Sequence, residues 1–235
     1  MNMAAEPANS SLVLPADDLL SQVRWGITYF FSSIAFSLGF SLRTEGSARV
    51  PKRGPALLVA NHQSYLDPVI IGLASRRALC YLARKSLFKN PAFGWLIRSL
   101  NAVPIDQEGV GKEGIKAVLE LLRAGRAVVV FPEGNRSSDG KMKDLKPGIQ
   151  LLLKRTEAPV LPVGIAGAYD AWPRQQKLPL PSPLFWPATP RTMAVSVGRP
   201  LDSRHLAQLP REQVLTELSD QLHVVVARAE KLRRK

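Results

Sequence analysis

Short apolar runs alternate with amphipathic stretches along most of the chain. The apolar runs are typical of strands buried on both faces, and they occupy residues 56–60, 78–83, 102–105, 127–131 and 160–166. A further strand is expected at residues 192–197, with side chains alternating outside and in. Helical patterns occupy residues 68–75, 91–100, 112–124, 147–155 and 212–231. This alternation predicts a single α/β domain, in which helices flank a mixed, largely parallel sheet.

Two polar clusters each follow one of the predicted strands directly. The first is residues 61–67 (NHQSYLD), and the second is residues 131–137 (FPEGNRS). In open α/β sheets the loops that leave the carboxyl ends of the strands gather at one edge, where ligands bind. We therefore expect the two clusters to face one pocket.

His62 is the best candidate for a general base, because imidazole titrates near physiological pH. Asp67 could hold the ring in the correct tautomer and stabilise the imidazolium. A regular helix would splay two residues five positions apart, so the pair can meet only if a turn precedes a helix that begins at Pro68. The alternative is a structural histidine beside an Asp67 that merely caps this helix.

The second cluster supplies the candidate substrate-binding residues. Glu133 brings a carboxylate, Gly134 lets the backbone approach a ligand, and Arg136 suits bidentate contact with phosphate. Asn135 lies between them and belongs to the same set. The alternative is that Arg136 is an ordinary solvated loop residue.

An uncharged apolar stretch precedes this domain. Residues 25–42 are bracketed by Arg24 and Arg43 and are just short of the length that spans a bilayer. We expect a membrane-anchoring helix at residues 23–43 after a flexible lead at 1–22. A buried core helix and a secretory signal are the alternatives, although no small-residue cleavage site clearly follows.

The remaining residues, 44–235, form the predicted domain. Residues 44–49 are expected to be a polar hinge, the core motifs lie within 55–200, and a basic helix occupies 211–235. One proline-rich segment, residues 169–191, breaks the alternation of strands and helices and carries Trp172, Phe185 and Trp186. Its aromatic side chains could line an acyl tunnel or touch a bilayer, or the segment could be a surface loop pinned by them.

Composition narrows the range of partners. The formal net charge is +13, which favours anionic partners such as nucleic acid, an acidic membrane surface or phosphorylated substrates. No nucleic-acid-binding motif is visible. The single Cys80 excludes an internal disulfide and points to a reducing compartment. With only three histidines besides, we expect no metal site.

Two sequence motifs of other enzyme classes are considered next: the glycine motif for dinucleotide binding is weak, and the motif for a serine nucleophile is missing. Residues 109–114 fit GxGxxG, but Asp106 and Glu108 lie before them and would repel a pyrophosphate. We therefore expect no bound cofactor. The chain also has no GxSxG elbow for a serine nucleophile.

Both polar clusters resemble motifs of one enzyme family. Residues 62–67 resemble the HxxxxD block of the glycerolipid acyltransferases, and residues 131–137 resemble their FPEGTRS block. Residues 161–165 (LPVGI) are similar to a later VPV-type strand, and residues 197–200 (VGRP) to a closing glycine–proline turn. The four blocks occur in the family's order over residues 45–202. The family resembled is the 1-acylglycerol-3-phosphate acyltransferases and their relatives.

This resemblance implies an O-acyltransferase of phospholipid biosynthesis. A fatty acyl group would pass from acyl-CoA or acyl carrier protein to a hydroxyl of a glycerolipid acceptor, foremost 1-acylglycerol-3-phosphate, giving phosphatidate. His62 would be the base, assisted by Asp67, and no covalent acyl-enzyme would form. Glu133 and Arg136 would position the phosphorylated acceptor. Membrane lipid is then a partner, and the catalytic domain is expected on the cytoplasmic side.

One position departs from the family pattern. Relatives usually carry an arginine that grips phosphate where this chain has Gln107, and glutamine contributes no charge. Lys112 or Arg84 could compensate. Other acceptors therefore stay open, namely glycerol-3-phosphate, a lysophospholipid or an amino-lipid, and so does a non-enzymatic role as a basic lipid-binding protein.

Overall fold

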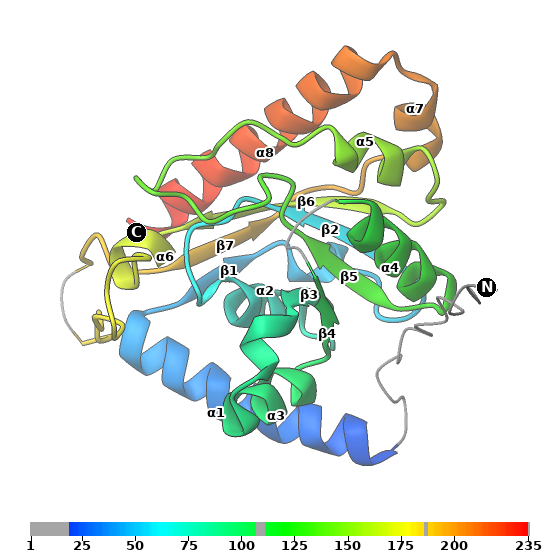
Figure 1. Ribbon diagram of the computed structural model, residues 1–235. Helices are drawn as coiled ribbons and strands as arrows, with labels where there is room; N and C mark the ends of the chain where they lie inside the picture. Colours follow the sequence, from blue (N-terminus) through cyan, green and yellow to red (C-terminus); the bar gives the residue numbers. More distant parts are fainter. Residues whose placement is uncertain (1–18, 107–110, 186–187, 235) are drawn as a thin grey trace, which may run out of the picture.

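The computed structural model describes residues 19–106, 111–185 and 188–234, which form a mostly parallel sheet between two layers of helices (Figure 1). The sheet has the order β1-β7-β6-β2-β5-β3-β4. Its strands are β1 (Arg43–Glu45), β2 (Ala56–Ala60), β3 (Cys80–Arg84), β4 (Ala102–Ile105), β5 (Ala127–Val130), β6 (Val160–Ala166) and β7 (Ala194–Val197). Strand β7 runs antiparallel to β6 and parallel to β1, and every other pairing is parallel. The predicted α/β fold with a mixed, largely parallel sheet is confirmed.

Most helices lie between successive strands, whereas α1 precedes the first strand and α7 and α8 follow the last one. They are α1 (Leu19–Phe40), α2 (Asp67–Ser75), α3 (Pro91–Ser99), α4 (Lys112–Arg123), α5 (Gly148–Leu153), α6 (Ala168–Ala171), α7 (Ser203–Gln208) and α8 (Arg211–Arg233). Two short 3₁₀ helices, η1 (Ser47–Arg49) and η2 (Lys85–Phe88), complete the described elements. The expected strands at 56–60, 102–105 and 160–166 have the bounds that the sequence predicted.

The centre of the sheet places the two polar clusters side by side. Strand β2 lies between β6 and β5, and Val59 pairs with Val130 in the parallel β2–β5 ladder. Both strands therefore end at the same edge, one residue before each polar loop begins. The two loops therefore leave the sheet at the same edge, as expected; that they face one pocket stays a prediction.

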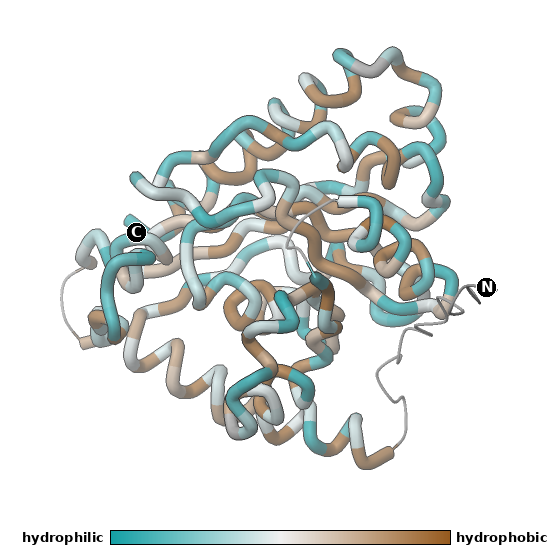
Figure 2. Tube along the Cα trace, viewed as in Figure 1, coloured by the Kyte–Doolittle hydropathy of each residue, from teal (hydrophilic) through white to brown (hydrophobic). Residues whose placement is uncertain are grey.

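Successive residues of the central strands pack into two hydrophobic cores, one on each face of the sheet. Leu57 and Val59 of β2 pack with α4, α5 and α8, whereas Leu58 and Ala60 pack with α2 and α6 on the other face. This follows from the period of two in a strand. Figure 2 shows the apolar residues concentrated in the central strands. Burial on both faces explains why these strands are uninterrupted apolar runs in the sequence.

The β1 edge of the sheet differs from the prediction. Residues expected to be a polar hinge instead form β1 and η1, and Glu45 accepts a hydrogen bond from the Ser196 hydroxyl of β7 at 2.6 Å. All four residues of β7 are buried, because β7 lies between β1 and β6 and contacts both α2 and α8. The expected alternation along residues 192–197 was therefore wrong.

Helix α1 begins earlier than predicted and spans about 33 Å at 1.5 Å per residue. Phe36 and Phe40 pack against the core on the α2 face. Its carboxyl end holds the proline-rich segment, since the amides of Ser182 and Leu184 donate to carbonyls at the end of α1. Among the helices described here, none is both long enough and apolar enough to cross a membrane.

Helix α8 lies directly on the central strand β6. A Cβ added to Gly164 would overlap the backbone of α8 at Val225 and Val226. Only glycine therefore allows this close approach of helix to sheet.

We predict that Gly164→Ala destabilises the protein by about 2 kcal/mol or more, because the new methyl group must push α8 off the sheet. Urea unfolding measures this loss. Gly26→Ala is the matched control, since a Cβ at Gly26 meets nothing within 4 Å and alanine favours a helix. Equal stability of the Gly164→Ala variant and the wild type would show that α8 does not pack this tightly.

Candidate active site

The first polar loop brings His62 and Asp67 into contact. Residues 61–64 are not helical, a turn follows at 65–66, and α2 begins at Asp67. The His62 Nδ1 atom lies 2.7 Å from Asp67 Oδ2. The expected turn before the helix is confirmed, although the helix begins one residue earlier than Pro68.

Asp67 does not cap the helix. Leu66 occupies the N-cap position without a capping side-chain bond, whereas Asp67 Oδ2 accepts the amides of Gln63 at 2.6 Å and Ser64 at 2.8 Å. Both donors precede the helix, so the capping alternative was wrong. Oδ2 is the acceptor of both amide hydrogen bonds, so the third hydrogen bond must be donated to it by the imidazole Nδ1. With its proton on Nδ1, the ring has Nε2 as its basic nitrogen.

The backbone and ring of His62 are held by the second polar loop. Its amide donates to Glu133 Oε1 at 2.8 Å, and its carbonyl accepts the Ser137 amide at 2.8 Å. The imidazole stacks on Phe131, with ring centroids 3.9 Å apart. The side chain keeps 15% of its surface exposed, while that of Asp67 is fully buried. The base is thus fixed in place and open to solvent on one side.

Two further contacts fasten the first loop to distant segments. The Asn61 side chain donates to the Ile165 carbonyl and accepts the Ile165 amide, extending the β2–β6 ladder by one pair. The Ser64 hydroxyl donates to the Trp172 carbonyl at 2.8 Å. Sequence reasoning missed both residues, because their partners lie about a hundred positions away.

Glu133 holds the two loops together. Its side chain is almost fully buried, and its two oxygens accept the amides of His62 and Lys143. Burial raises the pKa of Glu133, against the lowering effect of these two hydrogen bonds. The role expected from the resemblance was contact with the acceptor, whereas in the structure both oxygens are taken by backbone amides.

Arg136 is a partly buried residue that keeps an unsatisfied donor. Its guanidinium sits 3.4 Å from the centroid of the Tyr65 ring. Its Nη1 is buried without a hydrogen-bond partner among the described residues. A buried donor of this kind is costly unless a ligand or water satisfies it, so Arg136 is available to an anionic ligand rather than being a plain solvated residue.

Gly134 and Asn135 shape the turn between these side chains. Gly134 has a φ of 74°, a left-handed conformation that favours glycine. The Asn135 side chain accepts a hydrogen bond from Arg84 at 3.4 Å. One of the two residues expected to compensate for Gln107 therefore reaches this loop, while Lys112 begins α4.

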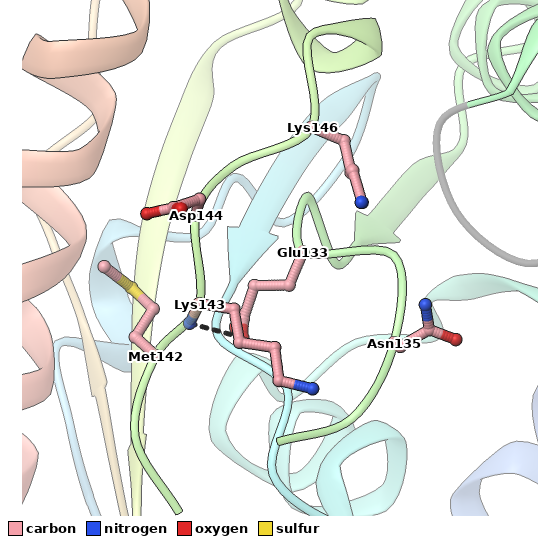
Figure 3. Close-up of a pocket in the computed structure, with 6 residues that line it drawn as sticks. All are labelled: Glu133, Asn135, Met142, Lys143, Asp144 and Lys146. Carbon is pink, nitrogen blue, oxygen red and sulfur yellow. Dashed lines mark hydrogen bonds between the residues drawn. The ribbon is translucent and has the colours of Figure 1, made fainter. Parts of the chain in front are cut away.

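A cleft of about 460 Å³ adjoins the second loop. Glu133, Asn135, Met142, Lys143, Asp144 and Lys146 line it, and Figure 3 shows the bond from the Lys143 amide to Glu133. Sequence reasoning did not identify Lys143 or Lys146. Isolated lysines in a loop carry no motif, so only their position in space reveals them.

Several other expectations concern residues outside the active-site loops. Gln107, residues 109–110 and Trp186 lie outside the described residues. The described part of the chain contains no group of three or more His, Cys, Asp or Glu side chains that could hold a metal ion. In the proline-rich segment, Trp172 packs on Tyr65 with ring centroids 5.2 Å apart, whereas Phe185 is 85% exposed. The first residues of that segment, expected to be non-helical, belong to the short helix α6.

Comparison with known proteins gives a consistent match. A family model described as Acyltransferase matches residues 41–166. A Bacillus subtilis protein named 1-acyl-sn-glycerol-3-phosphate acyltransferase is 25% identical over 191 residues, covering 81% of this chain and 88% of that protein. A Streptococcus pneumoniae protein of the same name is 35% identical over 113 residues, 47% of this chain. The match covers only 41% of the length of that second protein.

A solved structure agrees with these matches. The 1-acyl-sn-glycerophosphate (LPA) acyltransferase PlsC from Thermotoga maritima superposes with a TM-score of 0.72 and 26% sequence identity. The superposition covers 94% of this chain and 85% of that one. The likeness therefore extends over nearly the whole described fold.

We predict that Glu133→Gln speeds hydrogen exchange at the His62 or Lys143 amide by at least about tenfold. Glutamine offers one oxygen where the carboxylate offers two, so one of these buried amides must lose its acceptor. Amide exchange followed by NMR measures this. Glu157→Gln, at an exposed glutamate, is the control and should leave both rates unchanged. Unchanged exchange at both amides in Glu133→Gln would show that Glu133 does not hold the loops together.

Proposed function

The chain belongs to the acyltransferase family, and from this membership and the geometry of its active site we propose that it acylates a hydroxyl of 1-acylglycerol-3-phosphate to give phosphatidate. The acyl donor is acyl-CoA or acyl carrier protein, and no resident cofactor or metal takes part. The observation that carries the proposal is the 2.7 Å contact between His62 Nδ1 and the buried carboxylate of Asp67. It leaves Nε2 as an oriented base at the edge where the two loops meet.

His62 starts the reaction by taking the proton of the acceptor hydroxyl on Nε2. The acceptor oxygen then attacks the thioester carbonyl of the donor, and Asp67 stabilises the imidazolium. Collapse of the tetrahedral intermediate breaks the carbon–sulfur bond, and the leaving thiolate takes the proton back from His62. The ester forms directly, without a covalent acyl-enzyme.

In this proposal Arg136 binds the acceptor, whereas Glu133 positions the base. Arg136 contacts the phosphate of the acceptor, which is supported by its buried Nη1 without a protein acceptor among the described residues. Glu133 positions His62 through the backbone, which is supported by the two amides on its carboxylate. Gly134 and Asn135 form the turn that carries these side chains to the substrate.

Helix α1 is the proposed contact with the membrane. Apolar side chains at helical spacing are left exposed along it, and they are Leu20, Val23, Ile27, Phe30, Phe31, Ile34 and Leu38. Such a stripe on a helix held by its other face suits a position in the plane of a lipid interface. The net charge of +13 adds attraction to anionic lipid. We also propose that the domain faces the cytoplasm, a reducing compartment that suits a chain whose single cysteine, Cys80, has no second cysteine for an internal disulfide.

His62→Ala is expected to lower acyl transfer by at least about a thousandfold, since a positioned base contributes about 10²–10⁴ and its loss also removes the proton for the leaving thiolate. The assay is release of thiol from acyl-CoA and from acyl carrier protein. Acceptors to be compared are 1-acylglycerol-3-phosphate, glycerol-3-phosphate, a lysophospholipid and an amino-lipid.

The control for this variant is His205→Ala, because His205 lies on α7 and pairs with Glu217 away from the active site. It should keep wild-type activity. Turnover by His62→Ala at the wild-type rate would remove the base assignment. If the wild type released no thiol with any donor or acceptor, the proposed acyl transfer would be refuted. A basic lipid-binding protein would then be the remaining hypothesis.

For the membrane contact, we predict that the triple variant Phe30→Ser, Phe31→Ser, Ile34→Ser binds anionic vesicles at least about tenfold more weakly, because each buried apolar side chain contributes about 1.5–3 kcal/mol. Sedimentation with vesicles measures this. The control changes two exposed apolar residues on the opposite helical layer, Leu151→Ser and Val224→Ser. Equal binding by the triple variant and the wild type would exclude α1 as the anchor.

A further inference from the structure

Residues 142–146 form one wall of the cleft beside the second polar loop. The Lys143 amide donates to Glu133 Oε2 at 2.9 Å, and the Lys146 amide donates to the Pro132 carbonyl at 2.8 Å. Because Glu133 also accepts the His62 amide, a single carboxylate connects this wall to the base. The backbone positions of Lys143 and Lys146 are thus fixed relative to His62.

The two lysines present their charge on one side of this wall. Figure 3 shows the side chains of Lys143 and Lys146 directed to the side where Asn135 lies, and those of Met142 and Asp144 on the other. Alternation along an extended segment separates Lys143 from its neighbours in this way. The carboxylate of Asp144 therefore points away from the ammonium groups.

Most hydrogen-bond donors of the two ammonium groups have no acceptor within residues 19–106, 111–185 and 188–234. Lys146 Nζ makes no hydrogen bond or ion pair with any described residue, and Lys143 Nζ donates only to the Arg136 carbonyl at 2.9 Å. Each ammonium has three donors. Two cations that line one cleft and have donors to spare suit a phosphate group.

We propose that Lys143 and Lys146, beside Arg136, complete a phosphate-binding subsite for the acceptor, in which Lys146 is the main lysine contact. The inference rests on the proposed function, in which the acceptor carries a phosphate monoester. The subsite supplies positive charge to the phosphate. Relatives usually carry that charge on an arginine at the position where this chain has Gln107.

The position of the cleft favours the acceptor over the donor as the source of the phosphate. In 1-acylglycerol-3-phosphate only a few bonds separate the reacting hydroxyl from the phosphate. In acyl-CoA or acyl carrier protein the long pantetheine arm separates the thioester from the nearest phosphate. A cleft tied to the His62 backbone through one carboxylate matches the shorter spacing.

Lys146→Ala is expected to raise the KM for 1-acylglycerol-3-phosphate at least about tenfold, since the variant loses a charge-assisted hydrogen bond to the phosphate. The kcat and the KM for the donor should stay within about twofold. Lys146→Arg keeps the charge and should restore most of the acceptor affinity. Lys52→Ala, an exposed lysine before the opposite end of β2, is the matched control and should change neither KM.

Three results would overturn the subsite: an unchanged acceptor KM, a rise confined to the donor KM, or a loss that Lys146→Arg does not restore. Lys143→Ala is less informative, because it also removes the bond to the Arg136 carbonyl.

Binding of inorganic phosphate to the full chain gives a readout that needs no turnover. Line broadening of the ³¹P resonance should be strong with the wild type and with Lys52→Ala, and at least about tenfold weaker with Lys146→Ala. Equal broadening by all three proteins would contradict the subsite. Phosphate binding that depends on Lys146, in a protein that releases no thiol, would sustain the subsite while refuting the proposed acyl transfer.

Discussion

The buried carboxylate of Glu133 is the interaction on which the arrangement of the active site depends. It joins three segments by accepting the amide of His62 and the amide of Lys143 from its own place after β5. The parallel pairing of β2 and β5 makes this possible, since the two strands end at the same edge of the sheet, within one residue of each other. Burial raises the pKa of this group, so the two amide hydrogen bonds must offset the cost of placing a carboxylate there. In return, the Glu133 carboxylate fixes the position of His62 that the proposed reaction needs.

The base itself is arranged by local constraints within one loop. Asp67 Oδ2 accepts hydrogen bonds from the imidazole and from two preceding amides. These bonds fix both the tautomer of His62 and the path of the chain into α2. Phe131 covers one face of the ring. Little side-chain freedom is left to His62, so the reactive nitrogen is oriented before any substrate binds, and preorganisation of this kind lowers the entropic part of a reaction barrier.

Much of the fold could be predicted from the sequence, because strands buried on both faces are apolar runs and the helices between them have helical spacing. The pairing of His62 with Asp67 was also predictable, as the two residues are only five positions apart, on either side of one turn. The hinge at residues 44–49 was wrong, since its residues form η1 and part of the edge strand β1, which pairs with the distant strand β7. Asn61 as a ladder partner, Glu133 as a bridge and the lysines of the cleft depend on segments that meet only in the folded chain. Local pattern carries no signal for such contacts.

Direct transfer from donor to acceptor, with His62 as base and no acyl-enzyme, is the central claim. It is tested most directly by mixing the protein with an equal amount of acyl-CoA without acceptor, then following free thiol and the intact mass of the protein. With direct transfer, we expect no burst of thiol and no added acyl mass until the acceptor is supplied, when thiol and acylated product form together. A burst equal to the amount of protein, with an acyl group attached to the chain, would contradict it.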